Sequence, residues 1–249
     1  MEIRINFVGG LSEAQQAAFT IAAARWEEVL PEPLPLVMVG GETTDGVIID
    51  AEGLNIDGPG QILGSAGPTD LRPGFRGLPA RGVMNFDTSD IEMLEAEGTF
   101  QSVILHEMGH VLGIGTLWEP FNLLLGAGSE DPRFTGSLAT MIYRSLGGRD
   151  LTGVPVANTG GQGTRDGHWR ESTFVDELMT GFLSGERQPL SELTIAALAD
   201  LGYAVNLEAA DPYVLGEGTE ELLARPFCSR GIGRPEVNIL DENALIYEV

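Results

Sequence analysis

Lysine is absent from this chain of 249 residues, so all 14 basic side chains are arginines, against 37 aspartates and glutamates. The formal net charge of −23 argues against a protein that binds nucleic acid, because the phosphate backbone would be repelled. The acidity favours a soluble protein with a well-solvated surface. Long apolar runs are also missing, since LPLVMVG and NLLLGAG fall far short of the roughly 20 residues of a transmembrane helix.

The N-terminus, MEIRINFVGG, has neither the basic leader nor the apolar segment of a secretory signal. We expect a protein that stays inside the cell or one that lacks its leader. Cysteine occurs once, at Cys228, which excludes an intramolecular disulfide and any zinc site built from several cysteines. Histidine occurs three times, as His106, His110 and His168, so a site with three imidazoles has only one composition.

An apolar fraction of 43% and this length are typical of one folded domain, with room for two lobes around a cleft. The pattern predicts an α+β fold in which one twisted, mixed sheet is backed by two helices. The first helix should begin at a capping box of Ser12 and Gln15 and continue to about Val29. Strands are expected at 3–8, 36–40, 46–50, 61–67 and 81–87, separated by Gly, Pro and Asp turns.

Four more helices are expected further along the chain. A second capping box, SDIE at 89–92, predicts a short helix that stops at Gly98, after which Thr99 would cap the next helix. Later helices are predicted over SLATMIYRSLGG and over SELTIAALADLG, the last one capped by Ser191 and closed by Gly202.

The stretch HEMGH at 106–110 places two histidines four residues apart. On a helix, both imidazoles leave the same face, about 40° apart. A separate arc of apolar residues can anchor that helix in a core: Phe100, Ile104, Met108, Val111 and Leu112. Glu107 lies between the two arcs, where its carboxylate can reach a water on a bound metal ion. The pattern predicts a catalytic zinc site with Glu107 as general base.

The third ligand must come from further along the chain. Gly113 follows His110 by three residues and lets the chain leave the helix sharply. The metzincin signature has its third histidine three residues after this glycine, but IGTLW follows here, which leaves His168 in GTRDGHWRES. Met179, in FVDELMTG, then stands at the distance of a metzincin Met-turn. A rival third ligand, Glu171, leaves both the glycine and the methionine unexplained, so we favour the histidine.

Four segments in fixed order carry a resemblance to a known family: HEMGHVLG, an insertion ending GGQGTRDGHW, then ELMTG, then PLSELTIAALADLGY. The chain resembles the leishmanolysin-like branch of the metzincins over roughly residues 1–205. The resemblance implies a zinc endopeptidase in which Glu107 is the general base and Met179 packs beneath the metal. The implied zinc ligands are His106, His110 and His168.

The fold implied by the resemblance is zincin-like. Residues 1–113 would form an N-terminal lobe with the sheet and two long helices, and 114–205 a more irregular lobe across an active-site cleft. Residues 206–249 lie outside the resemblance and are predicted to form a tail packed on the domain. The implied partner is a protein or peptide substrate, the implied cofactor is one zinc ion, and we expect a monomer. The resemblance also suggests a location outside the cell or at its surface.

An extended substrate is expected to pair with the edge strand just before the motif helix, for which we take RGVMNFD at 81–87. Calcium is a second metal hypothesis. It depends on four aspartates expected in loops among the strands, namely Asp45, Asp50, Asp57 and Asp70. No spacing matches an EF-hand, and solvated turn aspartates explain the same pattern.

Two alternatives to an endopeptidase stay open at this point. One is a zinc hydrolase with a narrow or non-peptide substrate. The other is a non-catalytic, acidic calcium-binding surface module, although a decayed site should have lost Glu107 or one of its three histidines, and all four are present.

Overall fold

The computed structural model describes most of the chain. The described residues are 1–60, 63–74, 76–161, 163–183, 188–216, 225–226 and 237–245. Cys228 lies outside the described residues. None of the helices in the described part of the chain is long and apolar enough to cross a membrane.

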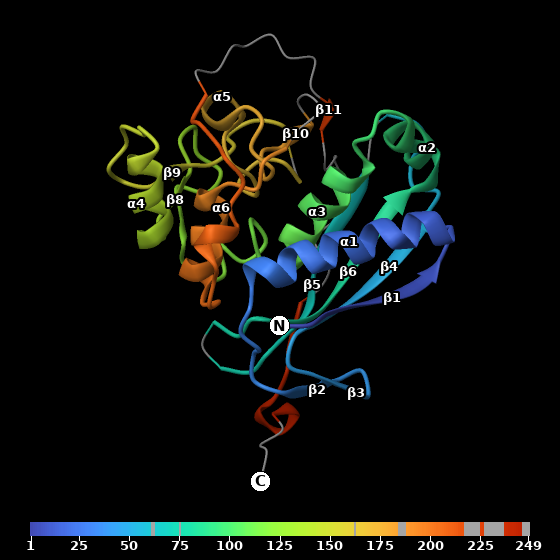
Figure 1. The fold of residues 1–249 in the computed structure, drawn as a ribbon. Helices are drawn as coiled ribbons and strands as arrows, with labels where there is room; N and C mark the ends of the chain where they lie inside the picture. The colour runs from blue at the N-terminus through green and yellow to red at the C-terminus, as the bar shows by residue number, and fades with distance from the viewer. Residues whose placement is uncertain are drawn as a thin grey trace.

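A five-stranded mixed sheet forms the centre of the first lobe (Figure 1), with strand order β1-β4-β6-β5-β12. Its strands are β1 (Ile3–Gly9), β4 (Val47–Leu54), β5 (Gly64–Leu71), β6 (Pro79–Asp87) and β12 (Asn238–Ile239). Neighbours pair in parallel except β5 and β6, which are antiparallel. The prediction that 81–87 is the edge strand is wrong, because β6 lies between β4 and β5. A central strand has both backbone edges occupied and cannot accept a substrate strand.

Two helices cover one face of this sheet (Figure 1): α1 (Glu13–Val29) and α3 (Phe100–Val111). The predicted capping box of α1 is confirmed, since Ser12 accepts from the Gln15 amide and the Gln15 side chain accepts from the Ser12 amide. Phe19 of α1 packs edge-on against Phe86 of β6 and Phe100 of α3, with ring centroids 5.2 and 6.4 Å away. This aromatic cluster joins the sheet and both helices into one core.

Other boundaries differ from the sequence prediction. The helix α2 (Thr88–Ala96) begins two residues early, because the Asp87 side chain caps it by accepting from the Ser89 amide at 2.8 Å. The same carboxylate also accepts hydrogen bonds from the amides of residues 56–58 in the loop after β4. This contact with a distant loop explains why Asp87, and not Ser89, caps the helix. Thr99 precedes α3 but makes no side-chain cap, and its hydroxyl donates to the Leu94 carbonyl instead.

The opposite face of the sheet carries a smaller apolar cluster built around a hairpin of β2 (Val37–Val39) and β3 (Glu42–Thr44). Its buried residues are Val37, Val39, Ile48 and Ala80. Residues 237–245 return to this lobe, where β12 joins β5 and Leu245, after the turn η2 (Glu242–Ala244), bridges to Val37. The strand β12 thus extends the sheet that begins with β1.

The second lobe has little regular structure (Figure 1). Its helical elements are α4 (Ser137–Ser145), α5 (Glu171–Phe174), α6 (Glu192–Leu201) and η1 (Leu207–Ala209). Its strands are β7 (Leu124–Leu125), β8 (Arg133–Phe134), β9 (Val154–Pro155), β10 (Phe182–Leu183) and β11 (Arg225–Pro226). The predicted caps of α6 are confirmed, because Ser191 accepts from the Thr194 amide and Gly202 closes the helix at φ 125°.

Candidate metal centre

The helix α3 presents two histidines on one face, as the spacing predicts. The ring centroids of His106 and His110 lie 4.6 Å apart and the rings are nearly perpendicular. Both side chains are buried, together with Glu107 between them. The anchoring residues Phe100, Ile104 and Met108 are also buried, which fixes the rotation of the helix about its axis.

Two glycines turn the chain away from the end of α3. Gly113 has φ 111°, a conformation that disfavours residues with a Cβ, and packs against the Leu117 and Leu201 side chains. Gly115, at φ 73°, approaches the returning chain so closely that an added Cβ would lie 1.9 Å from the Gly167 main-chain oxygen. The first turn was predicted, but the second was not, because only the fold brings residue 115 beside residue 167.

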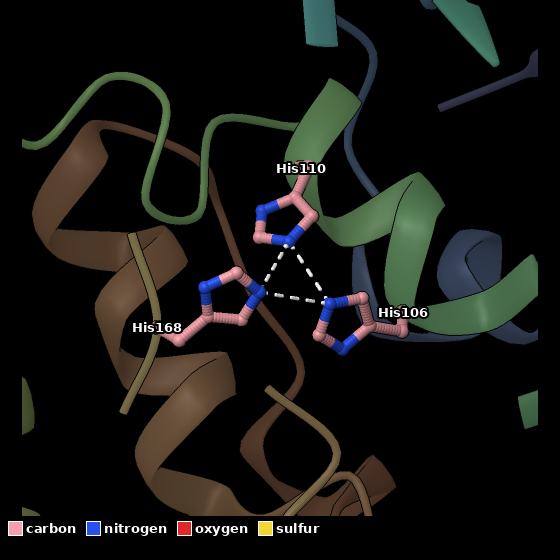
Figure 2. A group of neighbouring side chains, drawn as sticks. All are labelled: His106, His110 and His168. Carbon is pink, nitrogen blue, oxygen red and sulfur yellow. Dashed lines mark hydrogen bonds between the residues drawn. The ribbon is translucent and has the colours of Figure 1, made fainter. Parts of the chain in front are cut away.

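His168 enters the site on a short stretch held at both sides. Its carbonyl accepts from the Ala157 amide at 2.8 Å, and the amide of Trp169 donates to the Met179 carbonyl at 2.9 Å. These bonds place the His168 Nε2 atom 3.1 Å from that of His106 and 3.0 Å from that of His110. The remaining Nε2 pair, His106 and His110, is 3.0 Å apart, so the three atoms form a nearly equilateral triangle (Figure 2).

The other nitrogen of each ring decides where its proton lies. The Nδ1 atoms lie 2.7 to 2.9 Å from main-chain carbonyls: Leu178 for His106, Ile114 for His110 and Thr164 for His168. A carbonyl oxygen only accepts, so each Nδ1 carries the proton and each neutral ring leaves a lone pair on Nε2. Three lone pairs converging within 3.1 Å repel one another unless a cation lies among them.

Burial also favours the neutral form of His106. Burial lowers the pKa of His106 well below its ordinary 6.5, and the neighbouring His110 and His168 lower it further. Neutral imidazole with its Nδ1 bonded to a carbonyl is the form in which histidine binds zinc. The donor set therefore fits a zinc ion with three protein ligands. Among the described residues this triad is the only group of three or more His, Cys, Asp or Glu side chains close enough to share an ion.

Met179 lies buried next to the motif helix. A Cβ added at Gly109 would meet the Met179 Sδ atom at 2.7 Å and Trp26 Cζ2 at 3.3 Å. The glycine inside HEMGH therefore leaves the space that the methionine fills.

Glu177, two residues before Met179, was not singled out by sequence reasoning. It is fully buried, and its carboxylate accepts hydrogen bonds from the Met179 amide, the Ser191 amide and hydroxyl, and the Thr194 hydroxyl. Burial raises its pKa to about 7, against these hydrogen bonds, which favour the charged form. The available signal was an acidic residue two positions before the methionine, followed by the helix cap at SELT.

Glu171, the rival third ligand, lies apart from the triad and belongs to no potential metal-binding group in the described chain. It opens the short helix α5, and burial raises its pKa to about 7. The structure therefore brings His168, and not Glu171, to the pair on α3.

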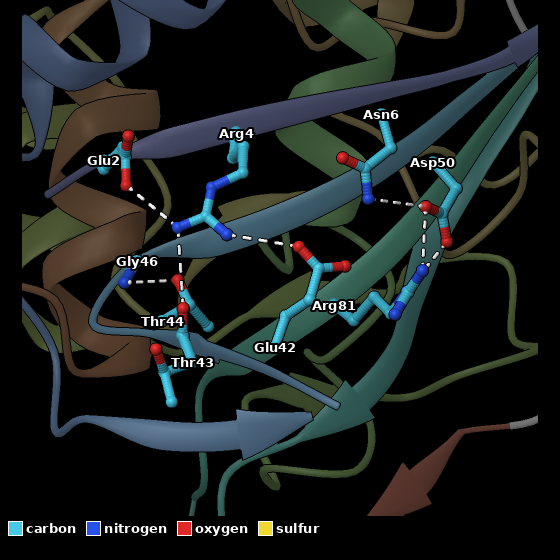
Figure 3. Close-up of polar contacts among 9 residues, drawn as sticks. All are labelled: Glu2, Arg4, Asn6, Glu42, Thr43, Thr44, Gly46, Asp50 and Arg81. Atoms are coloured by element: carbon cyan, nitrogen blue, oxygen red, sulfur yellow. Dashed lines mark hydrogen bonds and ion pairs between the residues drawn. The ribbon is translucent and has the colours of Figure 1, made fainter. Parts of the chain in front are cut away.

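The aspartates of the calcium hypothesis do not come together. Asp50 and Asp70 lie within β4 and β5, so their predicted placement in loops is wrong. Asp50 accepts two hydrogen bonds from Arg81, at 2.8 and 3.0 Å, and one from Asn6 (Figure 3). Asp45 and Asp57 join no potential metal-binding group of described residues. Calcium binding has no support in this arrangement.

Sequence comparison agrees with the geometry of the triad. The family model for leishmanolysin, peptidase family M8, matches residues 71–234, which include every residue of the candidate metal centre. A leishmanolysin homolog from Crithidia fasciculata is 31% identical over 134 residues, covering 50% of this chain and 20% of that protein. A leishmanolysin-like peptidase from Caenorhabditis elegans is 35% identical over 106 residues, covering 42% of this chain and 15% of that protein.

The chain therefore belongs to the leishmanolysin family of metallopeptidases. Peptidases of this family depend on zinc, and the histidine triad is a place where zinc could bind. The mixed sheet with its helices is compatible with the metzincin-like fold that the sequence predicted. The matched segments span at most a fifth of the length of these two relatives.

Proposed function

We propose that this chain is a zinc-dependent endopeptidase, with His106, His110 and His168 as the zinc ligands. The observation that carries the proposal is the triangle of Nε2 atoms, 3.0 to 3.1 Å apart, in which every ring has its proton held on Nδ1 by a carbonyl. Such a set of neutral donors is prepared for a divalent cation. Membership in a family of metallopeptidases gives the reaction class.

In this proposal Glu107 transfers a proton from the attacking water to the leaving amine. Bound zinc would supply a water with a pKa near 7 and polarise the scissile carbonyl. Glu107, adjacent to His106 and buried on the same helix, accepts the proton of the attacking water. It then donates that proton to the nitrogen of the leaving amine. The three Nδ1 hydrogen bonds hold the imidazoles in place while the charge on the site changes.

The strand β5 is a better candidate than β6 for pairing with an extended substrate. Phe100, at the start of α3, packs against Phe86, whose partner on β5 is Gly64. Near the end of α3, Val111 lies over Gly82, which is also close to the Gly67 carbonyl. The motif helix thus lies alongside β5. The end of the helix that carries His110 lies near residue 67.

Within the described chain, the outer edge of β5 is paired only at its last two residues, where β12 joins Asp70 and Leu71. We infer that a substrate strand adds along residues 64–69, beside the triad. Main-chain hydrogen bonds would hold the substrate there without regard to its sequence. The family resemblance also leads us to propose that the enzyme acts outside the cytoplasm.

The test is hydrolysis of an unfolded protein by the purified chain, with and without a zinc chelator. We expect internal cleavage that stops on chelation and returns when about one equivalent of zinc is added. Cleavage that resists chelation would contradict the proposal. A zinc-loaded chain that cleaves only small non-peptide esters or amides would instead favour the narrower hydrolase.

A further inference from the structure

Glu177 is the one fully buried carboxylate, besides Glu107, among the described residues of the site, and the proposed reaction does not use it. Its Oε1 accepts from the Ser191 hydroxyl at 2.7 Å, the Ser191 amide at 3.2 Å and the Thr194 hydroxyl at 2.5 Å. Its Oε2 accepts from the Met179 amide at 2.6 Å. All four donors lie on two segments, the Met179 turn and the first turn of α6.

One branch of this network leads to His106. The residue between Glu177 and Met179 is Leu178, whose carbonyl receives the Nδ1 proton of His106 at 2.7 Å. The Leu178 amide donates to the Pro189 carbonyl at 2.9 Å. With Met179 held by Glu177 and the Leu178 amide held by Pro189, the direction of the Leu178 carbonyl is fixed from both sides.

A second branch leads to His168. The Thr194 hydroxyl, which donates to Glu177, accepts from the indole Nε1 of Trp169 at 2.8 Å. Trp169 follows His168 directly, and its amide donates to the Met179 carbonyl at 2.9 Å. Glu177 is thus joined to the carbonyl partner of one histidine and to the chain neighbour of another.

We propose that Glu177 is a positioning residue that sets the orientation of His106 and His168 for zinc. The inference rests on the proposed zinc site but goes beyond it, since Glu177 touches neither a proposed ligand's Nε2 nor the substrate in this account. A carboxylate suits the task because it accepts four hydrogen bonds and donates none. Its place at the N-terminus of α6 favours the ionised form, because the helix dipole stabilises a negative charge there.

The test compares Glu177→Gln with a matched control, Asp200→Asn. Asp200 is a carboxylate in the same lobe that also accepts main-chain amides at the start of a helix, from Leu138 at 3.0 Å and Ala139 at 2.8 Å. Its partners lie on α4, which carries no proposed zinc ligand. Glutamine has the same size as glutamate but must place an NH₂ group against one set of donors. Glu177→Gln therefore breaks the network without leaving a cavity.

We expect Glu177→Gln to weaken zinc binding about 10- to 100-fold in a chelator competition, the usual cost of losing an outer partner of a metal ligand. Asp200→Asn should stay within about 3-fold of the wild type. The absorption spectrum of the cobalt-substituted protein should also change in Glu177→Gln alone, because it reports the ligand geometry. Equal zinc affinity in Glu177→Gln and wild type, or an equal loss in both variants, would overturn the inference.

A second variant covers the case in which Glu177→Gln does not fold. Thr194→Val removes only the hydroxyl between Glu177 and Trp169, and Thr194→Ser restores it. We expect weaker zinc binding in the valine variant and wild-type binding in the serine variant, while a valine variant with wild-type affinity contradicts the second branch. A wild-type chain that binds no zinc defeats the proposed function, which separates the two failures.

Discussion

Leu178 and His106 are joined by a hydrogen bond of 2.7 Å from the ring Nδ1 to the main-chain oxygen. The bond links the motif helix in the first lobe to the Met179 turn in the second, 72 residues further along the chain. A ring of the histidine triad on one lobe is thus oriented by the backbone of the other. The geometry of the candidate metal centre therefore depends on the packing of both lobes.

Removal of His168 should abolish zinc binding. We expect about one zinc ion per chain in the wild type and close to none in His168→Ala after dialysis, because two histidines alone hold zinc weakly. Glu171→Gln, which removes the rival ligand, should keep the metal. Metal analysis of the two dialysed variants decides between them, and zinc lost from Glu171→Gln but kept in His168→Ala would reverse the assignment.

Gly115→Ala should be far more disruptive than Gly128→Ala. Both glycines have φ 73°, so both substitutions carry the same backbone cost, about 1–2 kcal/mol. An alanine Cβ at 115 would also meet the Gly167 main-chain oxygen at 1.9 Å, whereas nothing lies within 4 Å at 128. We expect a loss of more than about 4 kcal/mol at 115, measured by denaturant unfolding. Equal losses would mean that the two segments do not meet in solution.

The raised pKa of Glu171 should make the free energy of unfolding fall as the pH rises. Burial raises its pKa from 4.5 to about 7, so between these values the unfolded chain releases a proton that the folded chain keeps. The contribution of Glu171 to stability is therefore full below pH 4.5 and is lost as the pH rises through about 7. Glu171→Gln does not titrate, and its melting temperature relative to the wild type should increase between pH 4.5 and 8.

This comparison is made on zinc-saturated protein, so that the histidines do not titrate over the same range. Glu119→Gln, at an exposed position, controls for the simple removal of a charge. A difference between Glu171→Gln and wild type that stays constant with pH would contradict the raised pKa of Glu171.

Local sequence signals predicted much of the fold. The helices α1 and α6 could be predicted because their end signals act within a few residues. These signals are the capping box at Ser12, the cap at Ser191 and the glycine at 202. The four-residue spacing of His106 and His110 likewise depends only on the geometry of one helix. These features need no knowledge of the rest of the chain.

Contacts between distant segments could not be predicted in this way. Asp87 replaces Ser89 as the cap of α2 because it also binds the amides of the loop at 56–58. The two-residue strand β12 exists only because β5 lies beside it, and the placement of β6 between two neighbours follows from pairing rather than composition. Glu177 was missed for the same reason, since its partners Ser191 and Thr194 become neighbours only after folding.

The most direct test of the central claim compares the wild type with Glu107→Gln on an unfolded protein substrate, both loaded with zinc. Glutamine keeps the size of the side chain but cannot accept the proton, so we predict a fall in kcat of at least about 10²- to 10⁴-fold with zinc still near one per chain. Wild-type activity in the variant would contradict the assignment of Glu107 as general base, and with it the mechanism proposed for this chain.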